Sequence, residues 1–161
     1  MQPTVDDFMT AVKAQDEDAI AKICGVPVEF PALLQGDGYE DCSKALDEKI
    51  FDFDYTIVKE EVNGNEASVD VKITTYPFED IMMKWTEDIT LDPGVFDGMS
   101  EEEKTAKEAE MFMNRLNEAG EKTYSKKVTL ELVKIDGTWI IEDKAVVDSL
   151  LSAIYGGAYE A

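Results

Sequence analysis

The side chains that could do chemistry in this chain are carboxylates, lysines, tyrosines and two cysteines, because its 161 residues include no histidine. Histidine is the usual general base near neutral pH, a common zinc ligand and the partner that activates a serine or cysteine nucleophile. Without it, acid–base catalysis by Asp or Glu is the main enzymatic option left. The sequence therefore predicts a non-enzymatic domain with no catalytic residues and no cofactor, and a metal-independent enzyme that works through carboxylates is the alternative.

The two cysteines, Cys24 and Cys42, are 18 positions apart in the sequence. In an oxidising compartment they could form a disulfide, and in a reducing cytosol they would be two thiols. Both alternatives are open at this point. A catalytic role is not expected for either cysteine, since no histidine is present to act as its base.

Two acidic stretches, residues 36–41 and 88–97, hold carboxylates at the close spacing that can surround a hard cation. Neither matches the twelve-residue calcium loop, which ends in a bidentate glutamate. We interpret both as solvated loops and predict no metal site.

Five aromatic residues could line a concave pocket between the sheet and the helices described below: Tyr55, Tyr76, Trp85, Tyr124 and Trp139. Aromatic walls suit a small organic ligand. Ordinary core packing is the alternative for aromatic side chains on alternating strands. These five residues are the candidate ligand-binding residues.

The first third of the chain is predicted to be helical. Apolar residues at helical spacing indicate a helix over 5–14 and a second over about 17–24. Two prolines and a Gly-Asp-Gly turn predict a loop over 25–42. Ser43 is then expected to open a third helix, which carries Ala45, Leu46, Ile50 and Phe51 toward the core.

Two antiparallel hairpins are predicted by alternating apolar and polar residues. The first runs from Phe53 through a turn at 63–65 and returns over 67–75, where every second residue is apolar or threonine. The second has Val128, Leu130 and Leu132 on one strand, a turn at 136–137, and Trp139 and Ile141 on the other.

The stretch from Pro77 to Gly120 is expected to be a helical insert between the hairpins. Residues 80–90 could form one helix, and the capping box Ser100-Glu103 opens another that ends near Gly120. A closing helix is predicted from the stripe Val147, Leu150, Leu151, Ile154 and Tyr155, with Gly156 and Gly157 ending it. The whole chain, 1–161, is thus predicted to be one α+β domain, with the N-terminal helices and the C-terminal helix packed on one face of a four-stranded antiparallel sheet made of two hairpins.

The opening VDDFMTAVK (residues 5–13), the hairpin segments YTIV and VNGNEASVDVKIT, and the closing VTLELVKIDGTWII (residues 128–141) resemble the cystatin-like and nuclear transport factor two-like superfamily. More narrowly, the chain resembles bacterial putative lipoproteins of unknown function. The resemblance implies an extracellular or cell-surface, lipid-anchored protein of the cell envelope. A cytoplasmic location is the alternative, because no export signal or lipobox cysteine is seen in this sequence.

The net negative charge of the chain limits the kinds of molecule that it can bind. The chain carries 36 acidic and 15 basic residues, a formal charge of -21, and Arg115 is its one arginine. Scattered lysines among carboxylates do not suit nucleic acid or an anionic membrane. No apolar run is long enough to span a bilayer, so no direct membrane insertion is expected. We predict a domain that binds a small molecule or a protein through its sheet face or its insert, with the oligomeric state left open.

Salt should stabilise this protein. Folding concentrates like charges, and about 0.15 M salt reduces the screening length to roughly 8 Å, which weakens their repulsion. We expect the melting temperature to rise between about 10 mM and 0.15 M sodium chloride, with only a small further rise in millimolar calcium at matched ionic strength. Flat melting curves would contradict the repulsion argument, and a steep, saturable response to calcium would contradict the absence of a metal site.

Overall fold

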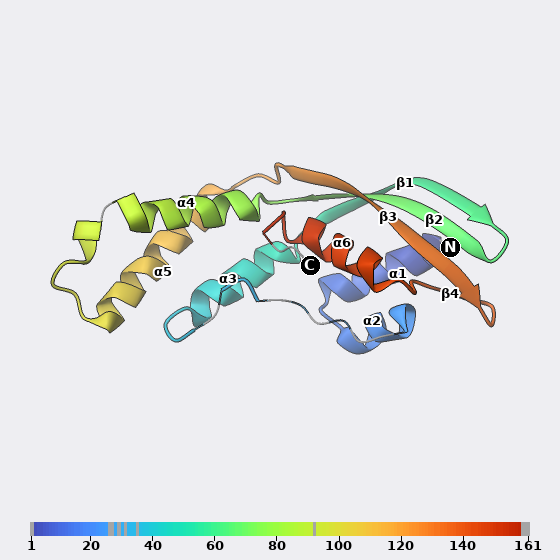
Figure 1. Ribbon diagram of the computed structural model, residues 1–161, viewed down its shortest axis with the longest axis horizontal. Coiled ribbons are helices and arrows are strands. Elements are labelled where there is room, and N and C mark those ends of the chain that lie inside the picture. Colours follow the sequence, from blue (N-terminus) through green and yellow to red (C-terminus); the bar gives the residue numbers. More distant parts are fainter. Residues whose placement is uncertain are drawn as a thin grey trace.

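The computed structural model describes residues 2–25, 28, 30, 32–34, 36–91 and 93–158. Within these residues the helices are α1 (Gln2–Lys13), α2 (Glu17–Cys24), α3 (Glu40–Ile50), α4 (Phe78–Leu91), the short 3-10 helix η1 (Pro93–Phe96), α5 (Glu101–Glu118) and α6 (Lys144–Ile154). The strands are β1 (Asp54–Asn63), β2 (Glu66–Thr75), β3 (Tyr124–Ile135) and β4 (Thr138–Ile140). The molecule is elongated, with the sheet at one end and the α4–α5 hairpin projecting at the other (Figure 1).

The strands form one antiparallel sheet in the order β1-β2-β3-β4. Sequence-adjacent strands are therefore neighbours, and the two predicted hairpins meet along the β2–β3 pairing. The predicted α+β fold, with a helical insert between two hairpins, is confirmed.

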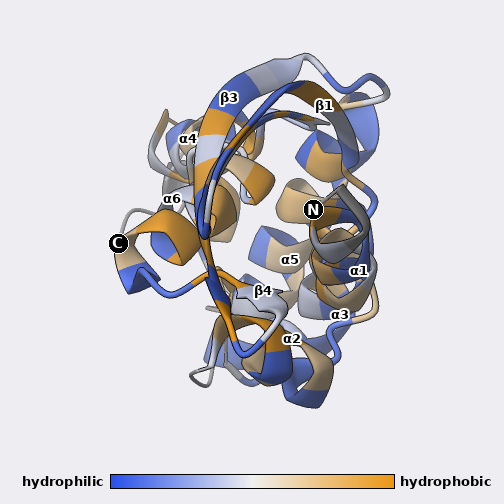
Figure 2. Cartoon of the chain, turned by 90° about the vertical axis from the view of Figure 1, so that its right-hand side faces the viewer, coloured by the Kyte–Doolittle hydropathy of each residue, from blue (hydrophilic) through white to orange (hydrophobic). Residues whose placement is uncertain are grey.

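One face of the sheet is apolar and buried. On β2, Ala67, Val69, Val71, Ile73 and Thr75 alternate with more exposed residues, as their spacing predicts. Ala67 lies opposite Leu132, Val69 opposite Leu130 and Val71 opposite Val128, so the same face continues onto β3. Figure 2 shows this alternation as orange and blue bands along β3 and shows the curvature of the sheet.

Amphipathic helices complete the core. Helix α1 buries Val5, Phe8, Met9 and Val12, and α6 buries Val147, Leu150, Leu151 and Ile154 beside β3 and β2. Both stripes follow the helical period that the sequence shows. The first and last helices thus share one core with the sheet.

Two predicted boundaries are wrong for identifiable reasons. Helix α3 begins at Glu40 rather than Ser43, because Glu40 and Asp41 supply negative charge that favours a helix N-terminus. Ile141 lies outside β4, which ends at Ile140. Its backbone N–H donates to the carbonyl of Ile23, 3.1 Å away, and its side chain is buried, so it holds α2 against the sheet edge.

The strand that begins the second hairpin is longer than its apolar residues predict. It starts at Tyr124, opposite Thr75, and its first residues are mostly exposed and polar. Pairing with β2, rather than an apolar pattern, extends it. The other boundaries of the helices and strands agree with the predicted ones to within about three residues.

The insert is fixed to the rest of the protein at defined contacts. The guanidinium of Arg115 on α5 binds Asp88 on α4 through two hydrogen bonds of 2.6 and 2.7 Å. The Trp85 Nε1–H donates to the carbonyl of Glu108, and the Tyr39 hydroxyl donates to the Glu108 carboxylate. Helices α4 and α5 are therefore joined to each other and to the segment before α3.

The C-terminal turn closes on the start of the insert. Gly156 has a φ of 59°, and a Cβ there would collide with the Tyr76 carbonyl oxygen and the Phe78 nitrogen. The Glu79 N–H donates to the carbonyl of Gly156 at 3.4 Å. Only glycine fits this position without moving backbone.

Replacing Gly156→Ala should destabilise the protein by about 2 kcal/mol or more, since it adds a backbone collision to the strain of a left-handed residue. Gly25→Ala is the matched control, because Gly25 has a φ of 71° but no atom within 4 Å of the added Cβ. It should cost about 1 kcal/mol. Urea unfolding of both variants measures the difference, and equal losses would contradict the close approach at Gly156.

Candidate functional site

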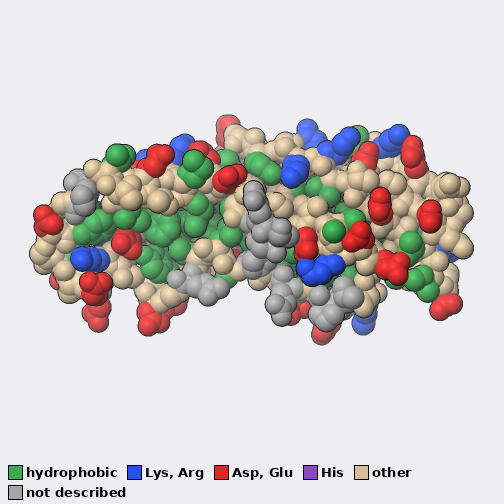
Figure 3. All heavy atoms as spheres, viewed as in Figure 1, with side chains coloured by type: hydrophobic (Ala, Val, Ile, Leu, Met, Phe, Trp, Pro, Cys, Tyr) green, Lys and Arg blue, Asp and Glu red, His purple; other side chains and the backbone are tan. Residues whose placement is uncertain are grey.

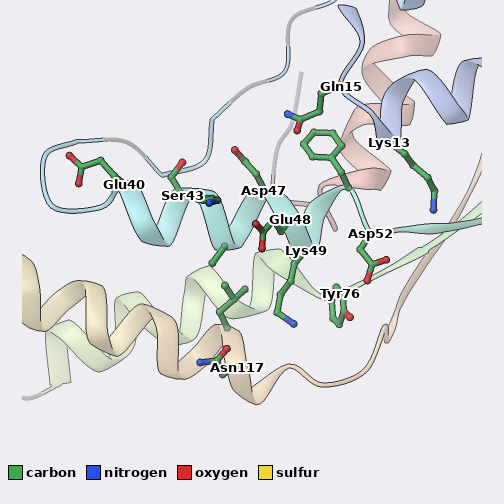
Figure 4. Close-up of a pocket in the computed structure, with 14 residues that line it drawn as sticks. Lys13, Gln15, Glu40, Ser43, Asp47, Glu48, Lys49, Asp52, Tyr76 and Asn117 are labelled. Atoms are coloured by element: carbon green, nitrogen blue, oxygen red, sulfur yellow. The ribbon is translucent and has the colours of Figure 1, made fainter.

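A cleft of about 1020 Å³ runs along the exposed side of α3. Figure 4 shows its side chains, which come from α3, the ends of α1 and α5, and the segments that flank the first hairpin. The lining residues are Lys13, Gln15, Glu40, Ser43, Lys44, Ala45, Asp47, Glu48, Lys49, Phe51, Asp52, Tyr76, Leu116 and Asn117. It is an open, polar cleft of mixed charge.

Asp47 is the unusual group in this cleft. Its side chain is half-buried, and its carboxylate has no hydrogen-bond or ion-pair partner among the described residues. Burial raises the pKa of Asp47 above its usual value. A carboxyl of this kind can exchange a proton or accept hydrogen bonds from a ligand more readily than a fully solvated one.

The other end of the cleft is built around Tyr76. The Lys49 Nζ lies 4.3 Å from the centroid of the Tyr76 ring, and the Lys122 Nζ lies 5.8 Å from it. Lys122 also pairs with Asp52 and Asp54, at 3.6 and 3.2 Å. The ring face of Tyr76 is therefore occupied by the protein's own cations.

The five predicted ligand-binding aromatics lie in several environments. Tyr76 lines the cleft, and Tyr124 begins β3, where it pairs with Thr75, the residue before Tyr76. The Tyr55 hydroxyl donates to Asp6 at 2.9 Å, while Trp85 contacts the rings of Tyr39 and Phe112 in the insert. Trp139 is on β4 with Lys134 over its ring. Of these five residues, Tyr76 alone lines one of the described clefts. A ligand role for the five stays a prediction.

Both cysteines are buried and free in the structure. Helix α2, which Cys24 ends, points away from the beginning of α3, where Cys42 lies (Figure 1). Burial raises the pKa of the Cys24 thiol to about 11, and burial is also the main cause that raises the pKa of Cys42. Raised pKa values leave few thiolates at neutral pH, so both thiols should react slowly. Their pairing in an oxidising compartment stays a prediction.

The two acidic stretches were the candidates for a cation site. Within the described residues no group of three or more His, Cys, Asp or Glu side chains could hold a metal ion. In the second stretch, Asp88 is bound to Arg115, whose hydrogen bonds lower the pKa of the carboxyl. Likewise, no described helix combines the length and apolar character needed to cross a bilayer.

The second candidate site is an apolar surface on the projecting α4–α5 hairpin (Figure 3). Leu91 is 80% exposed, and five further apolar side chains of the insert are only half-buried. They lie outside the set of residues packed on the core. We call these six the hairpin surface: Ile89, Leu91, Val95, Phe96, Met99 and Met111.

Sequence reasoning expected the insert as one of two possible binding faces but named none of these six residues. A signal was present, because five of the seven methionines lie between residues 82 and 113. Met side chains adapt to different partners and are common at binding surfaces. No comparable signal marks Asp47, whose partial burial depends on packing around α3.

No protein-family model matches the chain, and no curated protein matches its sequence. Among solved structures, it is similar to a Bacillus subtilis protein described as a putative lipoprotein (ycdA), at 15% sequence identity and a TM-score of 0.47. The match covers 94% of this chain and 46% of the other, so the chain spans about half the length of that protein. None of these comparisons confirms the cystatin-like resemblance.

The Asp47→Asn variant should be more stable than the parent protein at neutral pH. The pKa of Asp47 is higher in the folded state than in the unfolded state. Ionisation of Asp47 therefore lowers the free energy of unfolding above the folded-state pKa. This loss of stability disappears as the pH falls below both pKa values. We expect a higher melting temperature for the variant at pH 7 and no difference at about pH 3.5. Glu48→Gln, on the exposed neighbour, serves as the control. A gain that is independent of pH, or a loss at pH 7, would contradict the burial of this carboxylate.

Proposed function

We propose that the domain is non-enzymatic and binds a protein partner through the hairpin surface. The observation that carries this proposal is an apolar surface on helices that project from the body of the protein, with Leu91 80% exposed. Contiguous apolar patches on a soluble domain are typical of interaction sites. Helices held by the Arg115–Asp88 and Trp85–Glu108 hydrogen bonds present that surface in one arrangement, which lowers the entropy cost of binding.

The open edge of the sheet at β1 is a weaker candidate for a protein interface. This strand carries an irregularity between Ile57 and Lys59, and the ion pair Lys59–Glu61 lies on it. Bulges and charges of this kind discourage the addition of a further strand. The insert is therefore favoured over this edge.

A carboxylate-based enzyme is the second candidate, and Asp47 is the observation that favours it. A half-buried, unpaired carboxylate with a raised pKa in an open cleft has the property that a general base or acid needs. The cleft offers no histidine and its tyrosine face is covered by lysines, so the binding role is preferred.

The cell-envelope location and the cystatin-like superfamily belong to the same proposal, and the sequence resemblance supports them. A curved antiparallel sheet that shares one core with the first and last helices fits that resemblance. Lipid anchoring would place the hairpin surface outside the membrane, where a protein partner could reach it. The cytoplasm is the alternative location, and fractionation of the native cells separates the two.

Photo-crosslinking in the organism that makes the protein tests the binding role. A benzophenone amino acid at Leu91 should give one dominant protein adduct. The same amino acid at Val62, which is 56% exposed at the far end of the sheet, should not give it. The control matters because both positions hold exposed aliphatic side chains. No adduct at Leu91, or the same adducts at both positions, would contradict the proposed function.

A further inference from the structure

The insert that carries the hairpin surface is strongly acidic. Between residues 78 and 118 the sequence has twelve acidic and four basic residues. Any segment that docks on this surface must therefore approach a part of the protein with a net negative charge.

The four basic side chains of the insert are already paired within it. Lys84 pairs with Asp80, Lys104 with Glu101, and Lys107 with Glu110, at 3.0, 3.6 and 3.8 Å. Arg115 pairs with Asp88 and Glu118. Among the described residues, no cation of the insert is left to attract an acidic partner.

Several carboxylates of the insert have no such partner. Glu87 near the end of α4, Asp97 in the connection and Glu102 at the start of α5 form no ion pair among the described residues. All three are exposed. In the sequence they lie close to residues of the hairpin surface, on α4, in the connection and on α5, so the unpaired charge near this surface is negative.

The elements that carry the surface suit a helical partner. Helices α4 and α5 are adjacent, and helices commonly pack against other helices by interlocking their side chains. Met99 and Met111 on this surface can adjust to the side chains of a partner.

We propose that the partner segment is a basic amphipathic helix, with its apolar side on the hairpin surface and its Lys and Arg side chains toward Glu87, Asp97 and Glu102. This proposal rests on the proposed function and adds the chemistry of the partner. Charge complementarity supports it, since opposite charges around an apolar contact speed association and select the partner.

A second copy of the chain is disfavoured by the same charges. Two copies that meet at this surface would bring two acidic inserts together, on molecules that each carry a formal charge of -21. An anionic lipid surface meets the same repulsion.

The probe is a fluorescent peptide of leucine and lysine, with leucine at helical spacing and the 18-residue length of α5. Two control peptides accompany it: one with the same composition in scrambled order, and one with glutamate in place of lysine. Fluorescence anisotropy against the full chain measures the affinities. We expect saturable one-to-one binding of the first peptide, with both controls at least about tenfold weaker.

Variants locate the site, and the first two leave the charge of the protein unchanged. Leu91→Gln should weaken the basic peptide at least about fivefold, which is about 1 kcal/mol. Val62→Gln is the matched control and should leave the affinity unchanged. Glu87→Gln combined with Glu102→Gln should weaken the peptide and reduce the salt dependence of its binding. Melting curves confirm that each variant is folded.

The outcomes separate this inference from the proposed function. Equal binding of the scrambled peptide, equal binding of the glutamate peptide, or no effect of Leu91→Gln would overturn the basic helix as occupant, whatever crosslinking at Leu91 shows. Sedimentation that finds a dimer sensitive to Leu91→Gln would assign the surface to a second copy. Binding of phosphatidylglycerol vesicles that requires Leu91 would assign it to lipid, and either result overturns the inference.

Discussion

The pairing of β2 with β3 is the constraint on which the rest of the structure depends. Val69, Val71 and Ile73 on β2 have no exposed surface, and the register with β3 continues their apolar face across the sheet centre. This face gives α1 and α6 a surface on which to bury their stripes. The same strand ends where the insert begins, so the position of α4, and through it of the hairpin surface, is set by β2. Burial of apolar area at roughly 25 cal/mol per Å² makes this face the main source of stability.

The sequence predicted the features that burial imposes directly. Alternation over residues 67–75 and the helical stripes of the first and last helices were confirmed, because a one-residue shift in either pattern would expose apolar side chains. Features set by pairing or by a backbone contact were not predicted. Residues at the start of β3 join the sheet because β2 is beside them, and Ile141 leaves it because its N–H bonds to α2. Neither cause leaves a periodic trace in the sequence.

The candidate sites were less predictable than the fold. Sequence reasoning named five aromatics as candidates for one pocket, and their ligand role stays a prediction. In the structure Trp85 bonds within the insert, Tyr55 binds Asp6 on α1, and Trp139 lies on the short edge strand. Aromatic side chains fit cores and ligand pockets equally well, so residue type alone does not separate the two roles. What distinguishes the hairpin surface is the exposure of its apolar side chains, and that property depends on where other elements end.

The position of Tyr39 shows how the projecting helices become part of one folded body. Its ring contacts Trp85, which in turn contacts Phe112, and its hydroxyl donates to Glu108. Burial and the hydrogen bond to Glu108 raise the pKa of Tyr39 to about 12, so the hydroxyl remains a donor throughout the physiological range. Phe112 and Leu116 carry the contact into the main core. Two helices joined only at their bases would move relative to the sheet, whereas this chain of side chains fixes their angle. A protein that bound the proposed hairpin surface would therefore meet helices whose angle is already fixed, so ordering the insert would not reduce its affinity.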